Sequence, residues 1–433
     1  MCHFITRLQS SNLFRSFIIT AIGSGLSKAI LILGTFYCTN TLTKLEFGEY
    51  SFVRNTLTMI LTICASNYSG LCTKFATEAK SSIASLQRLL LLFLFSLFVC
   101  VLLGGILTIM PDSILITLLK TKESIGYFRL AGLLLPLFMV QPLIEGILRG
   151  LMKFKMVSWL QVLSSILYVV TLIVGIQLAG VDGAIWGLYL FYTIYAVASI
   201  WALIHIRNPH YYYSRLNHFW LEYHSIFKMV LPVFILSFVE APILWYLQVL
   251  MTRYSSAEAV GSMTVMLQIQ NFALLIPNYF FITYIAFAGR LNAEKKYEEY
   301  FARFDKFIKS FCLAGILIFV LFSLLSKNIL VLFGSAYVGD WKELVVCCLG
   351  IPIALMMTLI KQSLILQEHQ RELMYISITW NILWVVLFYY LVQIGFNTLM
   401  SFFISRFISW ILNWSLSIWL YNKDKTRLLS KKQ

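Results

Sequence analysis

The sequence predicts an all-α polytopic membrane protein with twelve transmembrane helices in two six-helix bundles. Of its 433 residues, 60% are hydrophobic and 12% are charged, whereas about a quarter of the residues in a typical soluble protein are charged. Apolar runs of about 20 residues recur along the chain, which is the length that a membrane helix needs. Such runs indicate helices, because in lipid only helices and closed barrels satisfy their own backbone hydrogen bonds.

Twelve apolar stretches are candidates for these helices. The first follows Arg7 and Arg15 and is too long for the apolar core of a signal peptide, and no small-residue cleavage site follows it. We therefore expect it to be retained as a helix. The predicted helices cover residues 16–38, 50–73, 89–110, 125–147, 157–179, 183–205, 228–250, 259–287, 308–332, 343–366, 373–395 and 397–420.

The distribution of positive charge predicts the orientation of the chain. When the N-terminus is placed in the cytoplasm, most of the 34 lysines and arginines fall in cytoplasmic segments. This follows the positive-inside rule and predicts that both termini are cytoplasmic. The same distribution explains the net charge of +15 without a nucleic-acid partner.

A long polar and aromatic link at 205–227 divides the chain near its midpoint. We predict an N-terminal bundle at 1–215 and a C-terminal bundle at 216–433. The turn Gly180–Gly183 has a counterpart at Gly395–Thr398 in the second half. Six helices return the chain to its starting side, so the halves would share one orientation about an axis along the membrane normal. Two such bundles would enclose a cavity.

Five cations remain inside the predicted helices. A charge at the bilayer centre costs roughly 2.5–3.5 kcal/mol on insertion scales and commonly marks a substrate or ion pathway. The alternative is snorkelling from a helix end to the headgroups; it suits Arg129 best, suits Arg54 and Lys361 about as well as an interior role does, and suits the deeper Lys28 and Arg406 poorly. The predicted substrate-binding residues are Lys28, Arg54, Arg129, Lys361 and Arg406.

Two carboxylates oppose these cations. Glu145 lies near the inner end of the fourth predicted helix and Glu240 in the middle of the seventh. Each is predicted to form a salt bridge or to couple transport to a proton or sodium ion. The chain has no phosphate-binding GxxxxGK[ST] motif, no D-x-D motif and no histidine or cysteine group with metal-ligand spacing, so we expect no cofactor and no metal.

Three motifs carry a resemblance to a known family. They are the Phe-Gly-x-Tyr pattern in Leu45–Ser51 after the first helix, the segment Glu145–Phe154 at the fourth junction, and the turn Gly180–Gly183. Together with twelve helices, they resemble the Wzx-type O-antigen and polysaccharide flippases of the multidrug/oligosaccharidyl-lipid/polysaccharide (MOP) exporter superfamily. The second half departs from the pattern, because its corresponding turn, Val260–Met263, lacks the aromatic residue.

The resemblance implies a V-shaped, MATE-like pair of bundles in the bacterial inner membrane, and a transporter rather than an enzyme. Such a protein moves oligosaccharide linked to undecaprenyl pyrophosphate from the cytoplasmic to the periplasmic leaflet during lipopolysaccharide or other polysaccharide biosynthesis. The implied partners are this lipid-linked oligosaccharide, membrane lipids and other polysaccharide assembly proteins. Related peptidoglycan-precursor flippases use cations in helices 1 and 2, where Lys28 and Arg54 stand here.

Three other functions remain open. A MATE-type drug exporter for cations would want acidic residues in its cavity, against which Lys28 counts. A peptidoglycan-precursor flippase usually has two further helices. A membrane polysaccharide polymerase or glycosyltransferase would need a sizeable outer loop with catalytic residues, whereas the predicted outer loops are short.

Overall fold

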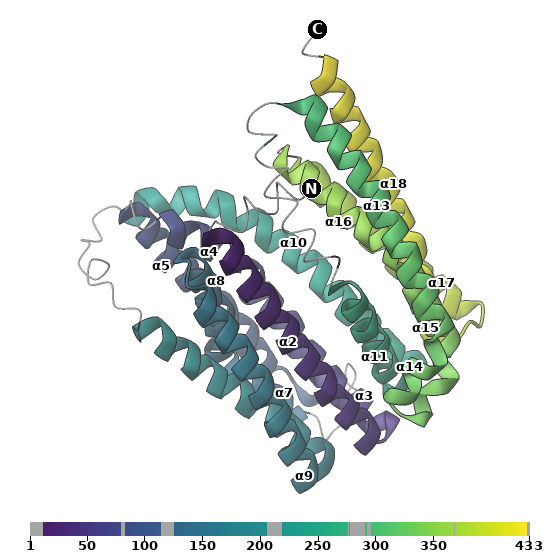
Figure 1. Ribbon diagram of the computed structural model, residues 1–433. Coiled ribbons are helices and arrows are strands. Elements are labelled where there is room, and N and C mark those ends of the chain that lie inside the picture. Colours follow the sequence, from purple (N-terminus) through teal and green to yellow (C-terminus); the bar gives the residue numbers. More distant parts are fainter. Residues whose placement is uncertain are drawn as a thin grey trace. The chain divides into compact units, whose positions relative to one another are not determined.

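The computed structural model shows an all-helical chain (Figure 1), as the sequence predicts. No strand occurs in the part of the chain that it describes, and eight stretches of that part are long and apolar enough to cross a membrane. The count of twelve helices and the side on which the termini lie remain predictions. The described residues are 12–78, 83–113, 125–205, 219–275, 277, 291, 296–367 and 369–430.

The chain divides into two compact units, Met1–Trp245 and Tyr246–Gln433. The division falls inside α10, Phe219–Tyr254, because the earlier part of this helix packs within unit 1. There the Trp245 Nε1 donates a hydrogen bond to the Thr56 Oγ1 at 2.9 Å. The sequence predicts the bundle boundary at 215/216, before α10, and that boundary stays a prediction about how the helices group.

Unit 1 contains the first helices of the chain. Each range predicted from hydropathy in this part overlaps described helix, but the predicted helix 50–73 is interrupted after residue 64 and the predicted helix 125–147 after residue 138. The elements, in order, are α2 (Asn12–Thr41), α3 (Lys44–Cys64), a short 3₁₀ turn (Ser66–Tyr68), α4 (Ser69–Glu78), α5 (Ile83–Ile109), α7 (Ile125–Phe138), α8 (Val140–Gly150), α9 (Phe154–His205) and most of α10.

The start of α3 corrects the sequence-based expectation for the first hairpin. The predicted ranges leave residues 39–49 between the first two helices and start the second helix at residue 50. Instead, Thr43 caps a helix that starts at Lys44: the Thr43 N donates to the Glu46 Oε2 at 2.8 Å, and the Glu46 N donates to the Thr43 Oγ1 at 3.3 Å. This reciprocal capping box places the Phe-Gly-x-Tyr motif inside the first two turns of α3.

The predicted tight hairpin after residue 179 is present within α9. Helical geometry breaks at Ala179 and Gly180, and Gly180 has a φ of 58°. Only glycine adopts this left-handed conformation without strain. Beyond the break the two arms touch, and a Cβ on Gly183 would overlap the carbonyl oxygen of Gly175.

Unit 2 is built around the pair α17 and α18, joined by a turn in which Gly395 has a φ of 91°. At one end of α18, Tyr421 packs on Phe301 and Phe304 of α13, with ring centroids 5.6 and 5.7 Å apart. The elements that follow α10 are α11 (Ala257–Ala273), α13 (Tyr297–Leu324), α14 (Ser326–Leu332), a 3₁₀ segment (Ser335–Asp340), α15 (Trp341–Leu349), α16 (Ile351–Leu366), α17 (Gln370–Gln393) and α18 (Thr398–Ser430).

Candidate functional site: intramembrane cations

Lys28 lies on α2 beside a seam of small residues that packs against α9. The Ser24 Oγ donates a hydrogen bond to the Gln161 Oε1 at 2.7 Å, and Ser27 hydrogen-bonds Ser165. These contacts bring the two helices close together. The Lys28 side chain is exposed and forms no ion pair or hydrogen bond with any residue that the structure describes. Its ammonium is therefore available on the surface of unit 1.

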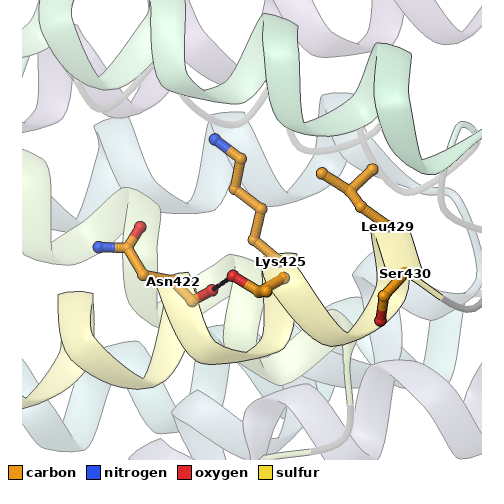
Figure 2. A pocket seen from close by; sticks show the side chains of 5 residues that line it. Asn422, Lys425, Leu429 and Ser430 are labelled. Carbon is orange, nitrogen blue, oxygen red and sulfur yellow. Dashed lines mark hydrogen bonds between the residues drawn. The ribbon is translucent and has the colours of Figure 1, made fainter.

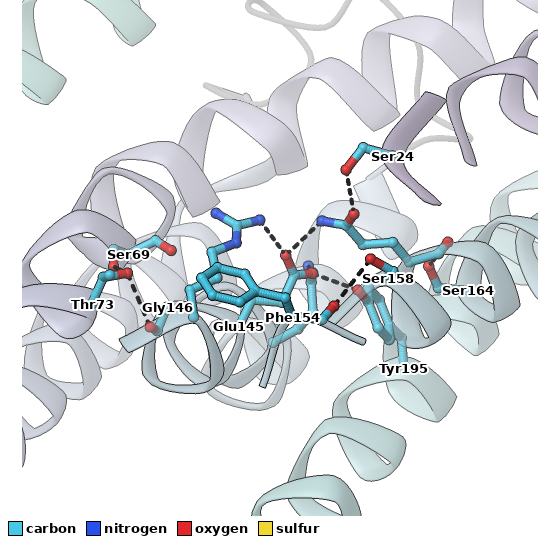
Figure 3. A network of polar contacts seen from close by, with 12 residues as sticks. Ser24, Ser69, Thr73, Glu145, Gly146, Phe154, Ser158, Ser164 and Tyr195 are labelled. Carbon is cyan, nitrogen blue, oxygen red and sulfur yellow. Dashed lines mark hydrogen bonds and ion pairs between the residues drawn. The ribbon is translucent and has the colours of Figure 1, made fainter. Parts of the chain in front are cut away.

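Glu145 is the centre of a polar network at the junction of α8 and α9 (Figure 3). The side chain is buried, and its carboxylate accepts hydrogen bonds from the Gln141 Nε2 at 2.8 Å, the Gln161 Nε2 at 3.2 Å and the Tyr195 Oη at 2.5 Å. It also forms an ion pair with the Arg149 Nη2 at 3.0 Å. Of the two roles left open for Glu145, this structure displays the salt bridge.

Arg54 sits among tyrosines of unit 1. The half-buried guanidinium lies 5.9 Å from the centroid of the Tyr50 ring and is close to the Tyr168 side chain. Tyr50 and Tyr168 hydrogen-bond each other, and Tyr192 is a further neighbour of Arg54. Within the described ranges no carboxylate forms an ion pair with Arg54. The guanidinium is thus oriented by neutral groups and keeps its full positive charge.

Arg129 has a different environment. Its Nη2 lies 2.5 Å from the Asp112 Oδ1, and the two side chains are 43% and 58% exposed. The charge of Arg129, in the first turns of α7, is therefore already matched by the carboxylate of Asp112, which follows α5. This pair favours a structural role for Arg129 over substrate binding.

Glu240 and Lys361 lie in different units. Glu240 is half-buried on α10, Lys361 is half-buried on α16, and each interacts with a neighbouring group. Their predicted roles, ion coupling or salt bridge for Glu240 and substrate binding for Lys361, remain predictions.

Arg406 is held on α18 by three neighbours. The Arg406 Nη1 donates to the Gln270 Oε1 at 3.0 Å. The guanidinium carbon lies 4.2 Å from the ring centroid of Trp410 and 5.9 Å from that of Trp384. Gln270 and the two tryptophans are all neutral, and no described carboxylate forms an ion pair with Arg406. Like Arg54, it is a half-buried, oriented and uncompensated cation.

A cavity of about 510 Å³ lies along the far end of α18 (Figure 2). Its one cationic lining residue, Lys425, is paired with the Asp305 Oδ2 at 2.5 Å. The cavity also lies beyond the predicted membrane helix, which ends at residue 420. It therefore does not belong to the group of intramembrane cations. The lining residues are Asn422, Lys425, Thr426, Leu429 and Ser430.

The sequence-based prediction missed the neutral partners of the two arginines. Two of them carried a detectable signal, because Tyr50 precedes Arg54 by four residues and Trp410 follows Arg406 by four, the spacing of neighbours on one helix face. Tyr168 and Gln270 carried none, since their contacts with the arginines join residues more than a hundred positions apart.

Comparison with known proteins identifies the family. The sequence model of a family described as "polysaccharide biosynthesis protein" matches residues 13–287. The chain belongs to this family. No curated relative matches the sequence.

Solved structures show that this polysaccharide biosynthesis protein has the fold of MOP-superfamily transporters. An inward-facing multidrug resistance MATE family transporter superposes with a TM-score of 0.76 at 16% identity, covering 94% of this chain and 96% of the other. A MOP superfamily transporter from Pyrococcus furiosus gives 0.64 at 17%, covering 99% and 98%. A MATE protein in complex with MaL6 gives 0.67 at 15%, covering 99% of each chain.

These findings confirm the family resemblance and the fold class predicted from the sequence. The protein is a multi-pass membrane protein of a polysaccharide biosynthesis family, and it shares its fold with transporters of the MATE family and the MOP superfamily.

Proposed function

We propose that the protein is a flippase that moves undecaprenyl-pyrophosphate-linked oligosaccharide, an O-antigen or similar repeat unit, from the cytoplasmic to the periplasmic leaflet of the bacterial inner membrane. The observation that carries this proposal is that three intramembrane cations are not paired with a described carboxylate. Lys28, Arg54 and Arg406 form no ion pair with a described carboxylate, whereas Arg129 and Arg149 each do.

An uncompensated cation at membrane depth is costly unless a counter-charge or water reaches it. A diphosphate headgroup supplies that charge, and charge-assisted hydrogen bonds to phosphate oxygens are among the strongest that proteins make. Arginine suits this ligand because its planar guanidinium can donate two parallel hydrogen bonds to one phosphate. The polar glycan would follow the headgroup through the protein, and the prenyl tail would stay in lipid.

The same charges disfavour an exporter of cationic drugs. An exporter of cationic drugs needs an available carboxylate, but Glu145 is fully engaged by Gln141, Arg149, Gln161 and Tyr195. The Pyrococcus furiosus transporter of the same fold is described as having a binding pocket of reverse polarity that suggests a different function. The fold alone therefore does not determine whether the substrate is a cation or an anion. The charges of the side chains determine it.

The test uses purified protein in liposomes and a fluorescent undecaprenyl-pyrophosphate oligosaccharide. We expect Lys28→Ala, Arg54→Ala and Arg406→Ala each to lower the flipping rate about ten- to hundredfold, because each removes a hydrogen-bonding partner of a charged group. Arg129→Ala is the matched control, since its charge is already paired with Asp112, and should flip at nearly the wild-type rate. Wild-type rates in all three test variants would overturn the proposal.

A further inference from the structure

We propose that Gln270 is a specificity-determining residue that positions Arg406 for an anion while leaving its charge uncompensated. This inference rests on the proposed function, because it concerns one of the three cations assigned to the substrate. It adds a requirement that the arginine alone does not impose. The residue that holds the guanidinium must be neutral.

The orientation of the Gln270 amide is fixed by a second contact. Its Nε2 donates to the backbone carbonyl of Cys347 at 2.8 Å, so its Oε1 points to the Arg406 Nη1 at 3.0 Å. The side chain is 2% exposed, and it therefore has no bulk water to replace either partner. Gln270 thus ties α11 to α15 and presents a single acceptor to Arg406 on α18.

A glutamate in the same place would have the same shape and a different effect. Its carboxylate would form an ion pair with Arg406, and in a buried setting such a pair is strong and little screened. It could not donate to the Cys347 carbonyl while ionised. The arginine would stay in place, but its charge would be neutralised from within the protein, and a substrate phosphate would have to compete with it.

Two tryptophans complete the surroundings of the Arg406 guanidinium without adding negative charge. Trp410 lies under the guanidinium at 4.2 Å, and its ring is confined by Gly350, where a Cβ would come within 2.9 Å of the ring. The Trp384 Nε1 donates to the Phe402 carbonyl at 3.3 Å. Both rings can attract a cation through their faces while leaving its N–H donors free.

These contacts define the class of ligand that Arg406 can bind. A guanidinium has five N–H donors, and the described contacts use one of them, on Gln270. A planar cation with several donors left fits an oxyanion that accepts two hydrogen bonds side by side, as one phosphate of a diphosphate does. A lysine ammonium would not reproduce this geometry, so we expect Arg406→Lys to bind almost as poorly as Arg406→Ala.

The experiment compares affinity and thermal stability in the full-length protein in nanodiscs, with undecaprenyl pyrophosphate as the probe. We expect Gln270→Glu to weaken binding at least tenfold while its melting temperature stays close to that of the wild type, because the new ion pair with Arg406 offsets the lost hydrogen bond to the Cys347 carbonyl. Gln270→Leu, which keeps the arginine charge but releases its side chain, should weaken binding only several-fold. Gln177→Glu, the same change at an exposed site in unit 1, should bind like the wild type.

The outcomes separate the two proposals. If Arg406→Ala weakens binding but Gln270→Glu binds like the wild type, the inference about Gln270 is wrong and the proposed function stands. If Arg406→Ala binds and flips like the wild type, the assignment of Arg406 to the substrate is wrong. A purely structural role for Gln270 would lower stability and affinity together in the glutamate variant. If that variant does not fold, wild-type affinity in Gln270→Leu overturns the positioning role.

Discussion

At the scale of single residues, the cations differ more clearly in whether a carboxylate pairs with them than in how deep they lie in a helix. Arg129 has Asp112 at 2.5 Å, whereas within the described ranges Arg54 lies among tyrosines and Arg406 beside Gln270 and two tryptophans, with no carboxylate paired to either. The sequence could name these arginines, because charges inside apolar runs stand out. It could not sort them, since a partner such as Gln270 is brought to Arg406 only by the packing of α11 on α18.

Glu145 provides a residue-scale prediction about stability. Glu145→Gln keeps the side-chain shape but removes the charge that Arg149, Gln161 and Tyr195 share. We expect the free energy of unfolding to fall by about 1–3 kcal/mol, measured as a lower melting temperature of the purified protein. Glu258→Gln, at an exposed position on α11, is the control. An unchanged melting temperature combined with loss of pH-dependent transport would instead assign Glu145 to ion coupling.

A second residue-scale prediction concerns the tyrosine contact of Arg54. Tyr168→Phe removes the hydroxyl that hydrogen-bonds Tyr50 near Arg54, but it leaves the charge of Arg54 in place. We expect a flipping rate a few-fold to about tenfold lower than the wild type, because the variant loses a neutral hydroxyl that orients the guanidinium, which costs about 0.5–1.5 kcal/mol. The loss should be smaller than in Arg54→Ala. An equal or larger loss would mean that Tyr168 contacts the substrate itself.

At the scale of elements, hydropathy located the apolar runs that form the described helices, but it did not predict the breaks within 50–73, 125–147, 308–332 and 343–366. Boundaries were less predictable where a cap overrides hydropathy. Thr43 and Glu46 start α3 at Lys44, which is six residues before the start at residue 50 that the apolar run predicts. The α9 hairpin was predictable in position from its glycines, but the close approach of Gly175 and Gly183 follows only from the packing of the two arms.

The hairpin gives a prediction with an internal control. Gly183→Ala would place a methyl group against the Gly175 carbonyl oxygen, so the two arms of α9 must separate. We expect a clear fall in melting temperature, corresponding to about 1–3 kcal/mol for overpacking. Gly105→Ala on α5 meets no atom within 4 Å and should be neutral or slightly stabilising, because alanine favours helix. Equal melting temperatures for the two variants would show that the arms of α9 are not packed this tightly.

At the scale of the whole molecule, the three uncompensated cations suggest how transport is driven. An inside-negative potential attracts a positively charged, empty carrier towards the cytoplasm, with about 2.3 kcal/mol per elementary charge for every 100 mV crossed. An anionic substrate cancels that charge, so the loaded carrier can turn outward without working against the field. The potential would then reset the empty protein.

The prediction at this scale is made in liposomes at fixed pH and sodium concentration. We expect the flipping rate to rise when a potassium diffusion potential makes the cytoplasmic side negative and to fall when the potential is reversed. The dependence should weaken in Arg406→Ala, which carries one charge fewer through the cycle. If the flipping rate of the wild type does not depend on the potential, this driving mechanism is excluded.

The central claim is that uncompensated cations recognise an anionic headgroup. It is tested most directly by changing the charge of the ligand while the protein stays the same. Binding of undecaprenyl pyrophosphate to the wild-type protein is compared with binding of uncharged undecaprenol of the same chain length. We predict that the diphosphate binds at least about a hundredfold more tightly, equivalent to two hydrogen bonds to charged groups, and that high salt reduces this preference. Equal affinity for the two lipids would contradict the claim.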